Sequence, residues 1–87
     1  MRIAWTSRAW EDFTEIILQD KQLIKRTLKL IDDLKRHPLS GIGKPESLSG
    51  QLSGYHSRRI DQKNRIVYRV EDDTIIIVQC GTHYGDK

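Results

Sequence analysis

The sequence predicts an α+β domain in which a helical hairpin covers one face of an antiparallel sheet. Two observations carry this prediction. Before His37, apolar side chains recur at spacings of three and four, and after Gly54 they alternate with a period of two. The expected order of elements is β-α-α-β-β-β, and 87 residues suffice for one domain, 1–87.

The first half of the chain predicts one strand and two helices. In residues 2–5, Ile3 and Trp5 alternate with smaller or polar residues, and Ser7 suits the N-cap of a helix that runs to about Gln19. Asp20 would cap a second helix, which should end before Pro38, because the residue that precedes a proline avoids helical geometry. We expect two apolar stripes in the core: Trp10, Phe13, Ile16 and Ile17 on the first helix, and Leu23, Ile24, Thr27, Leu30, Ile31 and Leu34 on the second.

The second half predicts a loop and three strands. Four glycines and two prolines lie between Pro38 and Gly54, which indicates an irregular segment of the kind that often carries functional residues. Strands are expected at 55–61, 65–71 and 74–80. The last of these is nearly continuous in apolar residues, which is typical of a central strand.

The hydrophobic pattern also predicts the register of the first hairpin. A three-residue loop at 62–64, with Asn64 in the left-handed conformation, places Ile60 opposite Ile66, whereas a two-residue turn would place Ile60 opposite a charged side chain. We therefore expect the longer loop. The face that the core does not use should then be lined by arginines: Arg59, Arg65 and Arg69.

Positive charge is concentrated in this second half. The net charge is +3, but between Lys44 and Arg69 six basic residues stand against two acidic ones, Glu46 and Asp61. The basic residues are Lys44, Arg58, Arg59, Lys63, Arg65 and Arg69. Such a concentrated field attracts a phosphate backbone, and a solvated sheet edge is the alternative explanation.

The sequence indicates a cytoplasmic protein that is not associated with a membrane. The longest apolar run, Ile75 to Val78, is far too short to span a bilayer, and the first residues lack the apolar region of a signal peptide. The single cysteine, Cys80, allows no intramolecular disulfide, which suits a reducing compartment.

Three residues could together cleave RNA without a metal ion. The reaction needs a base for the 2′-hydroxyl proton, an acid for the departing 5′-oxygen and a fixed cation for the charge on the phosphate. Glu46, His83 and Arg65 are the candidates, since histidine titrates near neutrality and the arginine fork holds two phosphate oxygens. Taken singly, Glu46 could be an ordinary loop residue and His83 part of a frayed end.

Other assignments stay open at this stage. His37 precedes the helix-ending proline, and His56 lies on a strand with no carboxylate near it in sequence, so both compete less well as the acid. A metal site of Cys80, His83 and His56 matches no standard spacing, and no cofactor is expected.

Several motifs resemble one known family. Gly-Ile-Gly-Lys-Pro-Glu-Ser-Leu occurs at 41–48, Leu-Ser-Gly-Tyr-His-Ser-Arg-Arg-Ile at 52–60, Arg-Ile-Val-Tyr at 65–68 and His-Tyr at 83–84. Together with the opening Ile-Ala-Trp-Thr, they strongly resemble the YoeB/Txe toxins of the RelE/ParE superfamily over nearly the whole chain. This resemblance implies a type II toxin that cleaves messenger RNA on the ribosome without a metal ion and so inhibits translation.

The resemblance also implies roles and partners. Glu46 would be the general base, His83 the general acid and Arg65 the stabiliser of the transition state, while Tyr84 would orient the RNA or stack on it. Lys44, Arg59, Arg58 and Lys63 would bind the RNA and its phosphates. The implied partners are ribosomal RNA, a YefM/Phd-type antitoxin and, by analogy, a second copy of the chain.

The chain departs from the family pattern at three places. Ser49-Gly50 stands where familiar members carry a basic residue, Lys63 occupies a turn position that is acidic in the best-known member, and Gly85-Asp86-Lys87 follows His-Tyr. Two rival functions also stay open. A ParE-like gyrase inhibitor would not need Glu46, Arg65 and His83 together, and a non-catalytic RNA- or protein-binding module would leave His83 unexplained.

Overall fold

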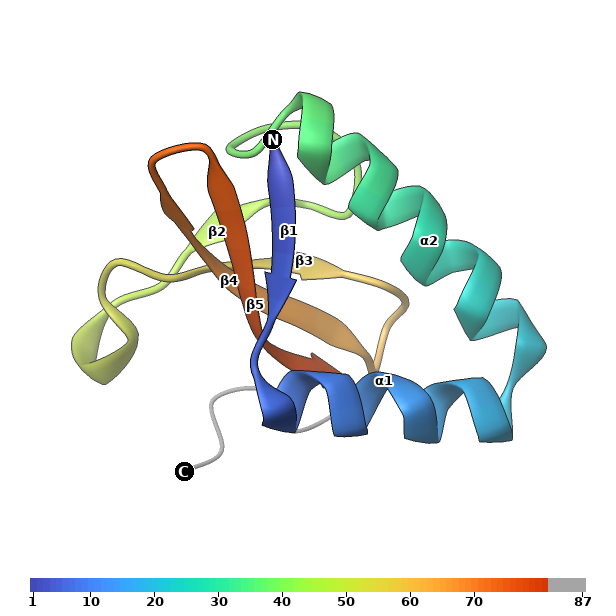
Figure 1. Cartoon of the computed structure of the whole chain (residues 1–87). Helices are drawn as coiled ribbons and strands as arrows, with labels where there is room; N and C mark the ends of the chain where they lie inside the picture. Colours follow the sequence, from blue (N-terminus) through green and yellow to red (C-terminus); the bar gives the residue numbers. More distant parts are fainter. Residues whose placement is uncertain (82–87) are drawn as a thin grey trace.

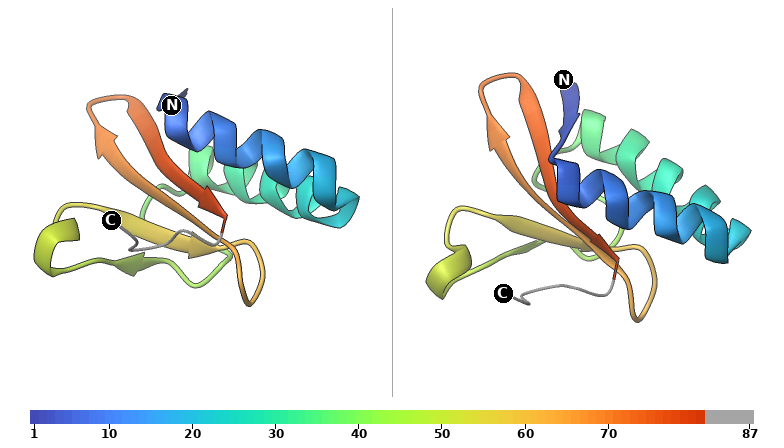
Figure 2. Two further views of the ribbon diagram at one scale, coloured as in Figure 1. Left: turned by 90° about the horizontal axis from the view of Figure 1, so that it is seen from below. Right: turned by 60° about the horizontal axis from the view of Figure 1, so that its bottom comes forward.

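Two helices lie on one face of a five-stranded sheet in the computed structural model, which describes residues 1–81 (Figure 1). The helices are α1 (Ser7–Gln19) and α2 (Lys21–Arg36), and a single 3-10 turn, η1, spans Gly50–Leu52. The strands are β1 (Arg2–Trp5), β2 (Glu46–Ser47), β3 (His56–Arg59), β4 (Arg65–Glu71) and β5 (Thr74–Gly81). The two views of Figure 2 show that the opposite face of the sheet carries no helix in the described part of the chain.

The strand order is β1-β5-β4-β3-β2, so β5 lies inside the sheet, as predicted. The α+β class is confirmed, but the sheet is mixed rather than purely antiparallel. The first strand, β1, runs parallel to β5, and the other neighbouring pairs are antiparallel. Neither helix in residues 1–81 is long and apolar enough to cross a membrane.

The helices begin where their cap residues place them. The N-cap of α1 is Thr6 rather than the predicted Ser7, because Thr6 is extended (φ −71°, ψ 161°) and its Oγ1 accepts from the backbone N–H of Ala9 at 3.2 Å. Asp20 caps α2 as predicted, accepting from the backbone N–H of Gln22 at 2.9 Å. The second helix ends before the proline, also as predicted.

The core lies between the two helices and the sheet. Its buried side chains come from α1 (Ala9, Phe13, Ile16), from α2 (Leu23, Leu30, Leu34) and from the strands and their ends (Ile60, Ile66, Tyr68, Ile75, Ile77, Cys80). The prediction of a core position was wrong for Trp10 and Ile17, which are 51% and 39% exposed. The predicted stripe was too wide, because only the side of α1 that faces the sheet is covered.

In the hairpin of β3 and β4, the side chains lie on the predicted faces of the sheet, but the residues that pair differ from those predicted. Arg59 pairs with Arg65, so the register differs by two residues from one that places Ile60 opposite Ile66. An even shift leaves every side chain on the same face. The prediction that Arg59 and Arg65 share one face of the sheet is therefore confirmed.

The turn of this hairpin is longer than predicted. The backbone N–H of Ile60 donates to the carbonyl of Asn64 at 2.8 Å, and Asp61 Oδ1 accepts from the backbone N–H groups of Lys63 and Asn64. Asn64 does not adopt the predicted left-handed conformation. The Asp61 carboxylate organises the turn instead, which removes the need for that conformation.

Candidate active site

Three strands bring Glu46, Ser57 and Arg65 together on the face of the sheet opposite the helices. Glu46 of β2 pairs with Ser57 of β3. The Nη1 atom of Arg65 lies 3.6 Å from Glu46 Oε1 and donates to Ser57 Oγ at 3.4 Å. The side chain of Glu46 is 59% exposed and that of Arg65 is 19% exposed. An ion pair this open to water is worth only ~0–1 kcal/mol, so a phosphate can compete with Glu46 for the guanidinium.

Arg59 and Lys44 are exposed and lie close to this pair in the fold. Arg59 is directly opposite Arg65 in the β3–β4 register. Its backbone N–H donates to the carbonyl of Gly43 at 2.7 Å, so the segment before Glu46 runs alongside β3. Lys44 adopts φ 51°, a left-handed conformation that turns the chain into β2.

Arg69 lies further along β4 on the same face. Its guanidinium carbon is 5.9 Å from the centre of the Tyr55 ring, and its Nε donates to Glu71 Oε2 at 3.1 Å. The hydrogen bond that Arg69 donates to Glu71 raises the pKa of Arg69. Arg69 therefore belongs to the predicted arginine face, but its charge is partly compensated by Glu71.

The structure contradicts the predicted phosphate-binding role of Arg58. Its side chain is fully buried on the helix side of the sheet, since it alternates with Arg59 along β3. Its Nη1 donates to Asp33 Oδ2 at 2.7 Å, and its Nη2 donates to the carbonyls of His37 and Ser40. The guanidinium thus has no access to an external phosphate.

Lys63 lies in the β3–β4 turn, two residues before Arg65, and borders a hollow of about 760 Å³ with Arg26 and Asp61. Neither Glu46 nor Arg65 is among the residues that line this hollow. Ser57, in contrast, contacts Arg65 in the structure although it was not among the predicted site residues. Its only signal in the sequence was its period-two alternation with Arg59.

Comparison with known proteins identifies the family. A family model described as the YoeB-like toxin of bacterial type II toxin-antitoxin systems matches residues 5–84. This chain belongs to that family. Toxin YoeB of Streptomyces coelicolor is 50% identical over 84 residues, which cover 97% of this chain and 100% of that protein.

Solved structures of similar sequence have the same fold as this YoeB-like toxin. A YoeB/ParE toxin from Agrobacterium tumefaciens is 38% identical, with a TM-score of 0.91 over 97% of this chain and 100% of that one. Two structures from Staphylococcus aureus are each 40% identical and cover 97% of this chain and 98% of theirs. One is a heterotetrameric YoeB-YefM toxin-antitoxin complex (TM-score 0.87), and the other is a YoeB dimer (TM-score 0.86).

Two predicted site residues of this YoeB-like toxin, His83 and Tyr84, lie outside the described residues. The last residue of β5, Gly81, is within them and pairs with Arg65. The described chain therefore ends beside the candidate site.

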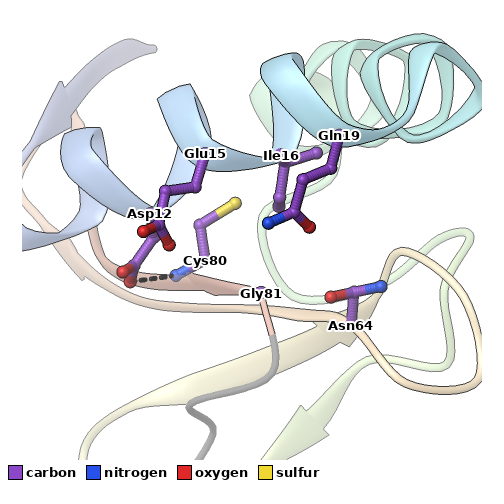
Figure 3. Close-up of a pocket in the computed structure, with 7 residues that line it drawn as sticks. All are labelled: Asp12, Glu15, Ile16, Gln19, Asn64, Cys80 and Gly81. Atoms are coloured by element: carbon purple, nitrogen blue, oxygen red, sulfur yellow. Dashed lines mark hydrogen bonds between the residues drawn. The ribbon is translucent and has the colours of Figure 1, made fainter.

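A second polar hollow of the toxin lies on the helix side of the sheet (Figure 3). It measures about 250 Å³ and is lined by Asp12, Glu15, Ile16, Gln19, Asn64, Cys80 and Gly81. Asp12 Oδ2 accepts from the backbone N–H of Cys80 at 3.3 Å. Burial raises the pKa of the Cys80 thiol to about 12, so the thiol is uncharged at neutral pH.

Two members of the alternative metal set, Cys80 and His56, line different hollows. His56 shares its hollow with Glu46, Ser47 and Tyr68, and its Nδ1 is 3.3 Å from Ser47 Oγ. Within residues 1–81 no three His, Cys, Asp or Glu side chains gather as they would around a metal ion. His83, the third member of the alternative set, lies outside that range.

Proposed function

We propose that this toxin is a ribosome-dependent, metal-independent endoribonuclease that cleaves messenger RNA and so inhibits translation. The observation that carries the proposal is the 3.6 Å approach of Glu46 to Arg65 on an exposed face, with Arg59 directly opposite Arg65. A carboxylate beside a fixed guanidinium supplies the base and the charge stabilisation that attack by a 2′-hydroxyl needs.

In the proposed reaction Glu46 takes the proton of the 2′-hydroxyl. The 2′-oxygen forms a bond to the adjacent phosphorus, and the bond from phosphorus to the 5′-oxygen breaks. His83 gives a proton to the departing 5′-oxygen, so the products are a 2′,3′-cyclic phosphate and a 5′-hydroxyl end. Arg65 exchanges Glu46 for the phosphate oxygens, while Arg59 and Lys44 hold neighbouring phosphates.

Two observations support the role of His83 as the acid and of Tyr84 as a residue that orients the RNA. The family match covers residues 5–84, so it includes both residues. The last described residue, Gly81, pairs with Arg65 of the candidate site, and the chain segment that contains His83 and Tyr84 follows it in sequence.

The proposal is tested with purified toxin, ribosomes and a defined message in excess EDTA. We expect cleavage to continue in EDTA, and we expect Glu46→Gln and His83→Ala each to reduce the rate by roughly 10²–10⁴, the usual contribution of a positioned base or acid. Glu15→Gln is the matched control, because Glu15 is an exposed carboxylate that lines the hollow on the other face of the sheet.

Three results would contradict this function. Folded Glu46→Gln or His83→Ala protein that cleaves at the wild-type rate would remove the assigned residue from the reaction. Activity lost in EDTA and restored by a divalent ion would indicate a metal-dependent nuclease. Inhibition of DNA gyrase without RNA cleavage would favour the ParE-like alternative.

We also propose that the toxin pairs with a YefM-type antitoxin and forms a homodimer. The support is the 40% identity to Staphylococcus aureus YoeB, whose structures include a complex with YefM and a dimer. Light scattering of the toxin alone, and after co-expression with the product of the neighbouring reading frame, measures both assemblies.

A further inference from the structure

We infer that Asp33 and Arg58 are positioning residues for the proposed cleavage, because together they fix the segment that leads to Glu46. We call the pair the Asp33–Arg58 clasp. The inference rests on the proposed role of Glu46 as the general base, and it assigns a function to an arginine that does not reach the RNA.

Glu46 needs such support, because the strand that carries it is short and its side chain is largely exposed. The strand that carries it, β2, has only two residues and lies at the edge of the sheet. The Glu46 side chain is 59% exposed, so packing does not fix it. The preceding residues, 37–45, contain no helix or strand. Apart from the pairing of β2 with β3 and the contact with Arg65, the position of Glu46 depends on what holds residues 37–45.

Arg58 holds that segment through its backbone carbonyl groups. From a fully buried position on β3, its guanidinium donates to the carbonyls of His37, Ser40 and Ile42. These three acceptors are spread over six consecutive residues, so one side chain anchors most of the turn between α2 and β2. A lysine could not do this, because it lacks the planar set of five donors.

Asp33 ties the same segment to α2. Its Oδ2 accepts both from Arg58 Nη1 at 2.7 Å and from the backbone N–H of Ile42 at 3.1 Å. The hydrogen bond from Arg58 holds the pKa of Asp33 below its ordinary value, so the carboxylate stays charged at neutral pH. Gly41 lies against this carboxylate, and a Cβ at that position would be 2.1 Å from Asp33 Oδ2.

The anchored segment passes directly to the candidate site. The carbonyl of Gly43 accepts from the backbone N–H of Arg59, and a Cβ on Gly43 would come within 2.8 Å of the Arg59 carbonyl oxygen. The chain is thus pressed against β3 immediately before Lys44 and Glu46. A misplacement of a reacting group by about 1 Å can cost on the order of 10²-fold in rate.

The test compares Asp33→Asn with Asp32→Asn in the ribosome cleavage assay under single-turnover conditions. The two variants change charge equally at adjacent positions of α2, but Asp32 only pairs with exposed Arg36. We expect Asp33→Asn to lower the cleavage rate at saturation by about 10–100-fold. Binding to ribosomes that carry a message with a 2′-deoxy residue at the cleavage position should change less than about twofold, since the exposed cations are untouched.

A second comparison uses a glycine variant that disturbs the clasp without changing the side chains of Asp33 or Arg58, together with a glycine variant as its control. Gly41→Ala would force Asp33 to move, whereas Gly50, which also has positive φ, has nothing within 4 Å of its Cβ position. We expect Gly41→Ala to reproduce the loss of rate and Gly50→Ala to leave the rate near wild type. Thermal unfolding shows that each variant is folded at the assay temperature, so a lower rate does not reflect unfolded protein.

Amide hydrogen exchange tests the clasp independently of catalysis. The N–H groups of Ile42 and Arg59 should lose protection in Asp33→Asn and keep it in Asp32→Asn. Unchanged protection, or a cleavage rate equal to that of Asp32→Asn, would overturn the clasp. If wild-type toxin does not cleave RNA but exchange at Ile42 and Arg59 still depends on Asp33, the proposed function fails and the anchoring of the segment stands.

Discussion

At the scale of single residues, the neighbouring Arg58 and Arg59 have opposite environments. Strand alternation sends Arg58 into the protein beside Asp33 and leaves Arg59 exposed opposite Arg65. Both were predicted to bind phosphate, because a basic cluster in sequence does not distinguish two faces of a strand. The tertiary partner of Arg58 comes from α2, 25 positions earlier, and no local pattern indicates it.

Cys80 provides a prediction at the same scale. Raising the thiol pKa from 9.0 to about 12 lowers the reactive thiolate fraction at neutral pH by on the order of 10³. We expect iodoacetamide to modify Cys80 slowly in native protein and rapidly in urea, as measured by intact mass. Fast modification of the folded protein would contradict the burial of this thiol.

At the scale of elements, α2 places positive charge beside Arg59. A hollow of about 320 Å³ between α2 and β3 is lined by Arg26, Lys29 and Arg59 together with Leu30, Ile42, Gly43 and Ile60. The residues that line it include no acid. Under the proposed function, these cations would hold phosphates of an RNA strand that continues beyond Arg59.

We therefore predict that Arg26→Gln combined with Lys29→Gln weakens binding to message-loaded ribosomes. The slope of log affinity against log salt concentration should fall by about 0.7 for each lost contact to a single-stranded phosphate. Lys21→Gln combined with Lys25→Gln is the control, since it removes equal charge from a different part of α2. Equal effects of the two double variants would mean that only net charge matters.

Most of the secondary-structure elements could be predicted from the sequence. Both helices and four strands follow from periodicity and caps, and the shared face of Arg59 and Arg65 follows from parity. The two-residue strand β2 lay in a segment predicted as a loop, because two residues give no period. The contact of Ser57 with Arg65 depends on pairing between strands, which a single sequence does not state.

At the scale of the whole molecule, stability depends on one layer of side chains between helices and sheet. Leu34 lies in that layer with 0% exposure, and Leu18 is 86% exposed on α1. We predict that Leu34→Ala lowers the free energy of unfolding by about 2–5 kcal/mol. Leu18→Ala should change it by less than about 0.5 kcal/mol. Urea denaturation measures both, and equal effects would contradict a core placed between these layers.

The pairing of β1 with β5 has a consequence for how the toxin is made. Strand β1 precedes the other strands in the sequence, and within residues 1–81 it pairs only with β5. Arg2 therefore cannot pair with Thr74 until most of the chain has been synthesised. Until β5 has been synthesised, β1 has no strand to pair with and Arg65 has no Gly81 beside it. Vectorial synthesis therefore cannot yield the complete five-stranded sheet from a shorter nascent chain, and the fold is completed only after translation has passed Gly81.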